Sequence, residues 1–179
     1  MTHRMPPVDT PENIDTVVLR PGDFHFGGGN TRISTLLGSC VSLTLWHPRK
    51  RIGGMCHYMM AERDQRTEPA GKRPDGRYAT EAFELFLLHI AKAATRPSEY
   101  QAKLFGGANM FGQKAEGKLD IGTRNIEIAH QFLASQHIAL LAEHIGGSGR
   151  RKLHFDVWNG NVWLAFPDGA GAEIRNPGG

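Results

Sequence analysis

Residues 38–57 read GSCVSLTLWHPRKRIGGMCH, two largely apolar runs separated by a polar, proline-containing turn. Over residues 41–46, three aliphatic side chains alternate with three others, which is the period-two pattern of a half-buried strand. The second run continues to residue 60. We therefore predict that 41–46 and 52–60 are neighbouring antiparallel strands of a hairpin whose turn is centred between Pro48 and Arg49.

Further elements flank this hairpin on both sides. Apolar residues recur at helical spacing from Phe83 onward and Pro97 ends the pattern, which predicts a helix that begins near Thr80. Asn159-Gly160 between two alternating runs predicts a second hairpin over residues 153–166. The other predictions are strands at 17–19, 33–37, 101–105 and 138–143, a helix at 125–136, turns at 21–23 and 27–30, and a long, mobile surface loop at 62–77. Many strands with two clear helices place the fold in the α+β or mixed α/β class.

The composition is that of one globular domain. Of 179 residues, 40% are hydrophobic and 22% are charged, as in ordinary soluble proteins. We find no internal repeat and no linker. We therefore predict a single domain over residues 15–168, with a flexible N-terminal arm at 1–14 and a flexible, glycine-rich tail at 169–179.

Composition also argues against several classes of function. The formal net charge is only +3 and no basic run is interleaved with aromatic residues, so we expect no nucleic-acid binding. No apolar stretch approaches the roughly 20 residues that span a membrane, and the N-terminus lacks the apolar core of a signal peptide. Two cysteines make no disulfide framework. We therefore expect a cytoplasmic protein with reduced thiols and no membrane insertion.

The predicted hairpin brings Cys40 and His57 together. A turn centred between residues 48 and 49 pairs residues whose numbers sum to 97, so Cys40 would lie directly opposite His57. Opposed side chains have Cβ atoms about 5 Å apart, which suits a thiol–imidazole hydrogen bond. Because side chains alternate along a strand, Cys56 would point to the other face, and a Cys40–Cys56 disulfide is disfavoured.

Cys40 allows two interpretations. It follows Gly38-Ser39, where a tight turn can expose backbone N–H groups that lower the pKa of a thiol and hold an oxyanion. Such a thiol would be the nucleophile of an amidohydrolase. The alternative is a small buried side chain without a chemical role, because free cysteine is among the most buried residue types.

A cysteine nucleophile also needs supporting groups. His57 would act as the acid and base, and a third residue should orient its ring, a role for which Ser34 and Thr35 are candidates. Ser39 is a candidate for holding the oxyanion. Asn109, in the glycine-rich turn after the strand at 101–105, is a candidate for polarising a substrate amide, although an ordinary turn hydrogen bond explains it as well.

Metal and cofactor chemistry has little support. The sequence contains no Cys-x-x-Cys pair and no His-Glu-x-x-His motif. Its glycine pairs fit neither the phosphate-loop nor the dinucleotide-binding pattern. We therefore predict that the protein uses no metal and no cofactor.

Several of these motifs together resemble the CheD family of chemotaxis proteins. The resemblance covers roughly residues 17–166. It rests on LLGSCV at 36–41, IGGMCHYM at 52–59, RYA at 77–79, FGGANMF at 105–111, IGTRN at 121–125 and the glycine pair at 146–147.

The resemblance implies both a fold and an activity. Members of that family are glutamine deamidases that act on methyl-accepting chemotaxis receptors, which implies a protein-glutamine glutaminase. The implied fold is a compact α/β (α+β) sandwich, with a mixed, largely antiparallel β-sheet core and two main helices. The family's nucleophile falls on Cys40 and its histidine on His57. Its third catalytic residue, usually a threonine, falls on Ser34, which keeps the hydroxyl, and Thr35 is the alternative.

The partners implied by the resemblance are the receptors, as protein substrates, and a chemotaxis phosphatase of the CheC type. Two rival functions stay open at this point. One is a regulatory module that binds receptors or the phosphatase without catalysis. The other is a cysteine peptidase, which shares the nucleophile but needs a cleft for a main chain.

Overall fold

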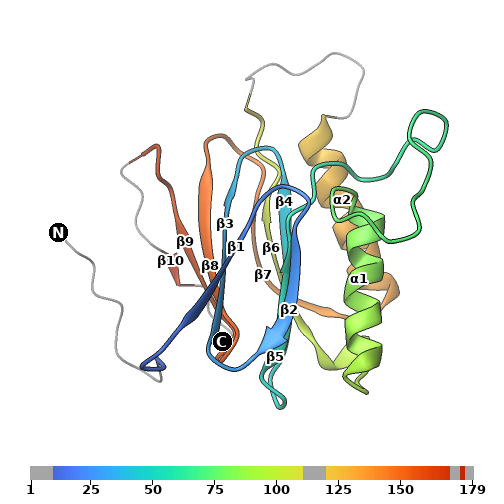
Figure 1. Cartoon of the computed structure of the whole chain (residues 1–179). Helices are drawn as coiled ribbons and strands as arrows, with labels where there is room; N and C mark the ends of the chain where they lie inside the picture. The colour runs from blue at the N-terminus through green and yellow to red at the C-terminus, as the bar shows by residue number, and fades with distance from the viewer. Residues whose placement is uncertain (1–9, 111–119, 170–173, 176–179) are drawn as a thin grey trace.

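The computed structural model describes residues 10–110, 120–169 and 174–175, and they form three layers (Figure 1). Two β-sheets lie face to face, and the two helices cover the outer face of the second sheet. The first sheet, sheet A, has the order β1 (Asp15–Leu19), β3 (Thr31–Leu37), β8 (Arg151–Asp156), β9 (Asn161–Ala165) and β10 (Ile174–Arg175). The second sheet, sheet B, has the order β2 (Phe24–Gly28), β5 (Ile52–Cys56), β4 (Val41–His47), β6 (Gln101–Gly106) and β7 (Ala139–Ile145).

The helices are α1 (Ala79–Lys92) and α2 (Ile121–Ser135), and a short 3-10 turn, η1 (Pro97–Glu99), precedes β6. The β1–β3 and β6–β7 pairs are parallel, and the other strand pairs are antiparallel. The predicted sandwich, with a mixed, largely antiparallel sheet core and two main helices, is therefore confirmed. No helix in the described ranges is both long and apolar enough to cross a membrane.

Two apolar cores hold the layers together, one on each face of sheet B. The strand β4 contributes to both because its side chains alternate. Its odd-numbered residues Val41, Leu43 and Leu45 pack against the helices. Its even-numbered side chains, such as Trp46, face sheet A and the core between the sheets. Burial on both faces explains why β4 has so few exposed side chains.

The β4–β5 hairpin forms as predicted, but with a different register. The observed pairs include Trp46 with Gly53 and His47 with Ile52, so the paired numbers sum to 99 instead of 97. The turn holds four residues, 48–51, and the His47 carbonyl accepts the Arg51 N–H at 2.8 Å. The predicted centre between Pro48 and Arg49 was therefore wrong by one residue, which shifts the pairing by two positions and preserves the face of every side chain.

Three other elements differ from the sequence predictions. The stretch around residues 27–30 was expected to be a turn, but β2 runs to Gly28 as an edge strand of sheet B, and its Phe24 packs edge-on against Phe86 of α1. The helix α2 begins at Ile121, ahead of the predicted start, because Asp120 caps it by accepting the Thr123 N–H. The β8–β9 loop holds four residues, 157–160, instead of a two-residue turn. Much of the arm predicted at 1–14 and of the tail predicted at 169–179 lies outside the described residues.

Candidate active site

Cys40 and His57 both face the space between the two sheets. Cys40 ends the bend at 38–40, through which the chain crosses from β3 of sheet A to β4 of sheet B. Its half-buried side chain packs against the core between the sheets. His57 follows β5 directly and is 1% exposed. The site therefore lies where the sheets meet, at the end of the sandwich that is uppermost in Figure 1.

The observed register makes Cys40 and His57 diagonal neighbours instead of directly opposed residues. The β4–β5 pairing continues through a bridge between Val41 and Tyr58, and in this register Ser42 stands opposite His57. Cys40 lies two residues before Ser42, on the same face. Diagonal neighbours lie about 7–8 Å apart, and long side chains bridge that distance. Cys40 and His57 therefore lie on the same face of the sheet, as predicted, although the register is shifted by two residues.

The second cysteine lies on the opposite side of the sheet, as predicted. Cys56 is fully buried in the core between sheet B and the helices, and its thiol points toward the Leu43 carbonyl at 3.8 Å. Both cysteines are free. Burial raises the pKa of the Cys56 thiol to about 12, so this thiol is inert near neutral pH.

Thr35 holds the ring of His57 from the opposite sheet. The Thr35 hydroxyl donates to the Leu19 carbonyl at 2.9 Å and lies 2.7 Å from His57 Nδ1. A hydroxyl has a single proton, which here is directed to Leu19. It must therefore accept from Nδ1, and this fixes the tautomer of His57 that carries its proton on Nδ1.

That tautomer leaves the other nitrogen of His57 as a base. Nε2 is buried and has no hydrogen-bond partner among the described residues. Burial lowers the pKa of His57 from its ordinary value of 6.5 to about 4, against a smaller opposing effect of the Asp23 carboxylate. At neutral pH the ring is therefore uncharged, and its one unpaired nitrogen is ready to accept a proton.

The Cys40 thiol is also uncharged at rest. The sequence led us to expect that backbone N–H groups would lower its pKa, and the N–H of Cys40 itself does act in that direction. Burial has the larger effect, however, and raises the pKa above its ordinary value. The expected direction was therefore wrong, because the bend places the sulfur against the core between the sheets.

Ser34 points away from this site. Its hydroxyl lies on the outer face of sheet A, 2.6 Å from Nδ1 of His154, the residue directly opposite it on β8. Counting positions back from Cys40 selected Ser34, but adjacent residues of a strand face opposite sides, so only one of Ser34 and Thr35 can reach His57. In this structure the residue that reaches it is Thr35.

A glycine-rich segment at the end of β6 lies against the main chain of the bend that carries Cys40. The Gly107 N–H donates to the Cys40 carbonyl at 2.9 Å, and the Ala108 N–H donates to the Gly38 carbonyl at 3.3 Å. Gly106, with φ of 107°, lies so close that a Cβ there would be 2.2 Å from the Cys40 carbonyl oxygen. No larger residue fits at position 106, which accounts for the first glycine of the Gly-Gly pair in the sequence motif.

The two remaining predicted residues flank the same bend. Ser39 is half-buried within it, next to the backbone N–H of Cys40, which acts to lower the pKa of the Cys40 thiol. Asn109 donates its backbone N–H to the Gly147 carbonyl at 2.9 Å, which anchors the segment. No sequence pattern points to the Leu19 carbonyl, because every residue carries such a group and only the fold selects one. No group of three or more metal-ligating side chains occurs in the described part of the chain.

Comparison with known proteins places this geometry in context. A family model described as "CheD chemotactic sensory transduction" matches residues 59–166. The chain is 66% identical over 169 residues to the probable chemoreceptor glutamine deamidase CheD 3 of Dechloromonas aromatica, covering 94% of this chain and 98% of that protein. It is 48% identical over 152 residues to a probable chemoreceptor glutamine deamidase, CheD 1, of Chromobacterium violaceum, with 84% and 77% covered. It is 42% identical over 159 residues to one from Pseudomonas savastanoi, with 88% of each covered.

Proposed function

Because this chain belongs to the CheD family, we propose that it is a chemoreceptor glutamine deamidase in which Cys40 is the nucleophile and His57 the acid and base. The observation that carries the catalytic assignment is the state of His57. Thr35 occupies Nδ1, while Nε2 is buried without a partner in the described residues, on the face that Cys40 shares. A histidine held this way is suited to remove a proton from a neighbouring thiol.

The first half of the reaction forms a thioester. With both groups neutral at rest, the Cys40 proton moves to His57 Nε2 as the sulfur attacks the side-chain carboxamide carbon of a receptor glutamine. The oxyanion of the tetrahedral intermediate is held by backbone N–H groups of the bend at 39–40. The intermediate collapses as His57 returns the proton to the leaving nitrogen, which departs as ammonia.

The second half hydrolyses the thioester. Neutral His57 accepts a proton from water, and the hydroxide formed attacks the thioester carbon. The C–S bond breaks, the sulfur takes the proton back from His57, and the product is glutamate. The net reaction consumes one water and releases one ammonia, and it requires no metal or cofactor.

The activity is tested by incubating the purified protein with chemoreceptor cytoplasmic domains and mapping Gln-to-Glu conversion by peptide mass spectrometry. We expect conversion at a small number of sites, with release of ammonia in equal amount. Cleavage of the receptor main chain would identify a peptidase instead. Receptors that remain unmodified over hours, although they bind the protein, would favour the non-catalytic regulatory module.

We expect replacements at Thr35 and Ser34 to have unequal effects, although the two residues are adjacent. A Thr35→Val variant keeps the shape of the side chain but removes the acceptor for Nδ1–H, so the ring can adopt the wrong tautomer. We expect kcat to fall by about 10–100-fold, in line with the loss of a group that orients a catalytic base. Steady-state rates on receptor domains measure it.

Ser34→Ala is the matched control, because it removes a hydroxyl of similar burial from the opposite face of β3. We expect its kcat to stay within about twofold of the wild type. A large loss at Ser34 together with a silent Thr35→Val would assign the orienting role to Ser34. A Thr35→Ser variant, which restores the acceptor, should recover most of the rate.

The place of the reaction and its partners follow from the same proposal. A catalytic thiol must stay reduced, which is the condition of the cytoplasm. The receptors are the protein substrates. Binding of a chemotaxis phosphatase of the CheC type remains a prediction from the family resemblance.

A further inference from the structure

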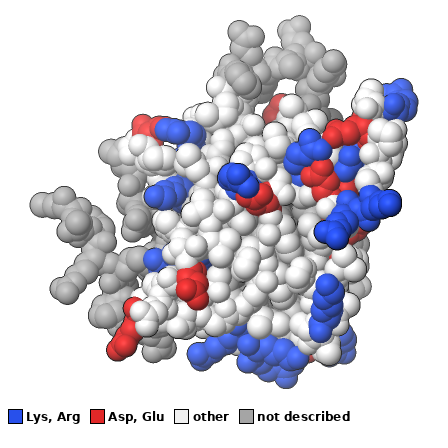
Figure 2. Space-filling view, in the orientation of Figure 1, with Lys and Arg blue, Asp and Glu red and all other residues white. Residues whose placement is uncertain are grey.

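A cluster of charged side chains gathers in the segment between Met60 and α1. Figure 2 shows basic and acidic side chains interleaved at the upper right, where Figure 1 draws the loop at 62–77. The sequence predicted this loop as a long, mobile surface loop. In the structure several of its charged residues bind one another and the first turn of α1, so these contacts give the loop a defined shape.

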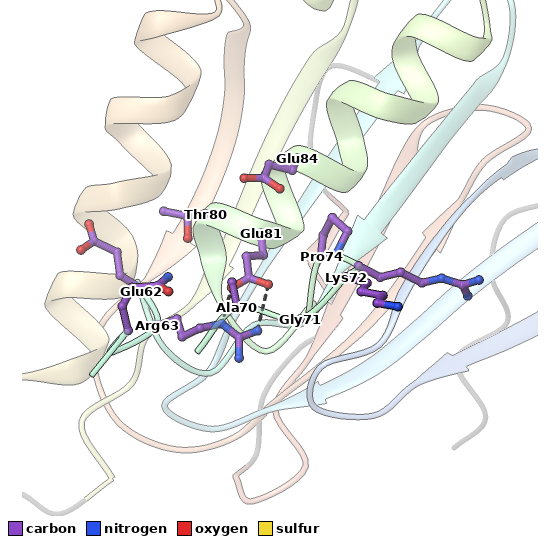
Figure 3. A pocket seen from close by; sticks show the side chains of 11 residues that line it. Glu62, Arg63, Ala70, Gly71, Lys72, Pro74, Thr80, Glu81 and Glu84 are labelled. Atoms are coloured by element: carbon purple, nitrogen blue, oxygen red, sulfur yellow. Dashed lines mark hydrogen bonds and ion pairs between the residues drawn. The ribbon is translucent and has the colours of Figure 1, made fainter. Parts of the chain in front are cut away.

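Arg63 is the centre of this cluster. Its guanidinium binds the Glu81 carboxylate through two hydrogen bonds of 2.7 and 3.0 Å, which Figure 3 shows beside a pocket between the loop and α1. Its side chain is only 6% exposed and lies over the Tyr78 ring, 4.6 Å from the centroid. Glu81 also accepts the Asp75 N–H at 2.7 Å. A paired, planar guanidinium of this kind fixes geometry as well as charge.

Arg77 extends the cluster toward the loop. Its guanidinium binds Asp75 at 2.7 Å and Glu68 at 2.7 Å, and the Tyr78 hydroxyl donates to the same Glu68. The stem of Arg77 lies directly over Gly22, where a Cβ would come within 2.7 Å of Arg77 Cγ. Gly76 also lies against Gly22, since a Cβ at position 76 would be 2.3 Å from the Gly22 carbonyl oxygen.

The residues held by this cluster are the ones that hold the backbone around His57. The Arg77 carbonyl accepts the N–H groups of Met59 and Met60, at 2.8 and 3.1 Å. The Gly22 N–H donates to the His57 carbonyl at 2.7 Å, and the His57 N–H donates to the Asp23 carbonyl at 3.2 Å. Arg77 thus binds the main chain just after His57 directly, and it packs against Gly22, whose own N–H binds the His57 carbonyl.

We propose that the ion-pair cluster of Arg63, Glu68, Asp75, Arg77 and Glu81 is a positioning device for His57. The cluster fixes Arg77 against Gly22. It thereby fixes the position of the His57 backbone and hence the orientation of Nε2 relative to Cys40. The proposal rests on the assignment of His57 as the base. It gives the loop at 62–77 a role in the chemical step that does not require contact with the receptor.

Arg77→Gln tests this inference, because it removes the pairs with Glu68 and Asp75 at a half-exposed position. An imidazole displaced by a fraction of an ångström transfers protons less well, so we expect kcat on receptor domains to fall about tenfold with KM unchanged. Arg77→Lys should recover part of the rate. Glu68→Gln, at a partly exposed position, changes the charge of one partner only, and it keeps the proposal testable if Arg77→Gln folds poorly.

Arg49→Gln is the matched control. It also breaks a surface ion pair of 3.0 Å, with Glu99, but in the β4–β5 turn at the opposite end of the strands. We expect this variant to keep the kcat and KM of the wild type. Thermal unfolding of all variants separates a loss of rate from a loss of fold.

A second readout does not depend on receptors. The rate at which iodoacetamide alkylates Cys40, followed against pH, reports how the thiol interacts with His57. We expect Arg77→Gln and Glu68→Gln to change this profile and Arg49→Gln to preserve it. A wild-type kcat together with an unchanged alkylation profile in both loop variants would overturn the positioning role. A rise in KM with kcat unchanged would overturn it as well, because it would mean that the loop contacts the receptor. If the wild-type protein modifies no receptor, the proposed function fails, while the alkylation profiles still decide the coupling between the loop and His57.

Discussion

A Cys40→Ala variant is expected to deamidate receptor domains at least about 10³-fold more slowly than the wild type, because the remaining cysteine, Cys56, faces the helices and cannot form the thioester in its place. The substitution should leave the fold intact. Cys40 is only half-buried and donates no hydrogen bond from its sulfur within the described residues, so we expect a change of about 1 kcal/mol or less in the free energy of unfolding. The measurement is receptor deamidation by mass spectrometry, alongside a urea titration.

Cys56→Ala is the natural control, since it removes the second thiol from the other face of the same sheet. Cys56 is fully buried among the residues packed on the helices, so we expect a cost of about 1–2 kcal/mol in stability from the small cavity. Deamidation should nonetheless stay near the wild-type rate. Retained activity in Cys40→Ala would refute the covalent mechanism, and loss of activity in a folded Cys56→Ala would show that the wrong thiol had been assigned.

The second large effect is expected at His57. In a His57→Asn variant the side-chain amide N–H takes the place of Nδ1–H and still donates to Thr35, but no basic nitrogen remains. We expect kcat to fall by about 10²–10⁴-fold, the usual contribution of general acid–base catalysis. The mass-spectrometric assay used for Cys40 measures it. A variant that stays folded and active within tenfold of the wild type would exclude His57 as the base.

The pH profile gives an independent check on His57. The base must be neutral, and burial lowers its pKa to about 4, so activity should fall as the pH drops through about 4 instead of near the ordinary value of 6.5. The same shift affects stability. The unfolded chain binds a proton at higher pH than the folded one, so the free energy of unfolding decreases as the pH falls from about 6.5 to about 4. Circular dichroism at each pH therefore has to accompany the rates.

Much of the fold could be predicted because its strands alternate strongly. The β4–β5 hairpin and the helix α1 were both evident from periodicity and punctuation by proline. The strand β2 was missed because Gly27 and Gly28 signal a turn, whereas its stability comes from pairing with β5 and from two phenylalanines packed near α1. That support is tertiary, and no local pattern reports it.

The candidate site was predictable in part for a similar reason. Cys40 and His57 share a face whether the paired numbers sum to 97 or 99, because a shift of two residues preserves side-chain direction. The identity of the residue that orients His57 changes with a single step along β3, because adjacent residues face opposite sides of the sheet. Counting positions from Cys40 could not decide between Ser34 and Thr35. That choice is made by pairing between β3 and β8, which places Ser34 opposite His154 on the outer face.

The crossing of the chain at the bend 38–40 has a consequence for when the protein becomes active. Neither sheet holds a complete site, since Thr35 belongs to sheet A and His57 follows a strand of sheet B. Sheet A in turn needs β8, which begins at Arg151 and is therefore synthesised long after Cys40. In the proposed mechanism, a nascent or truncated chain that contains Cys40 but not β8 therefore has its nucleophile but cannot orient its base.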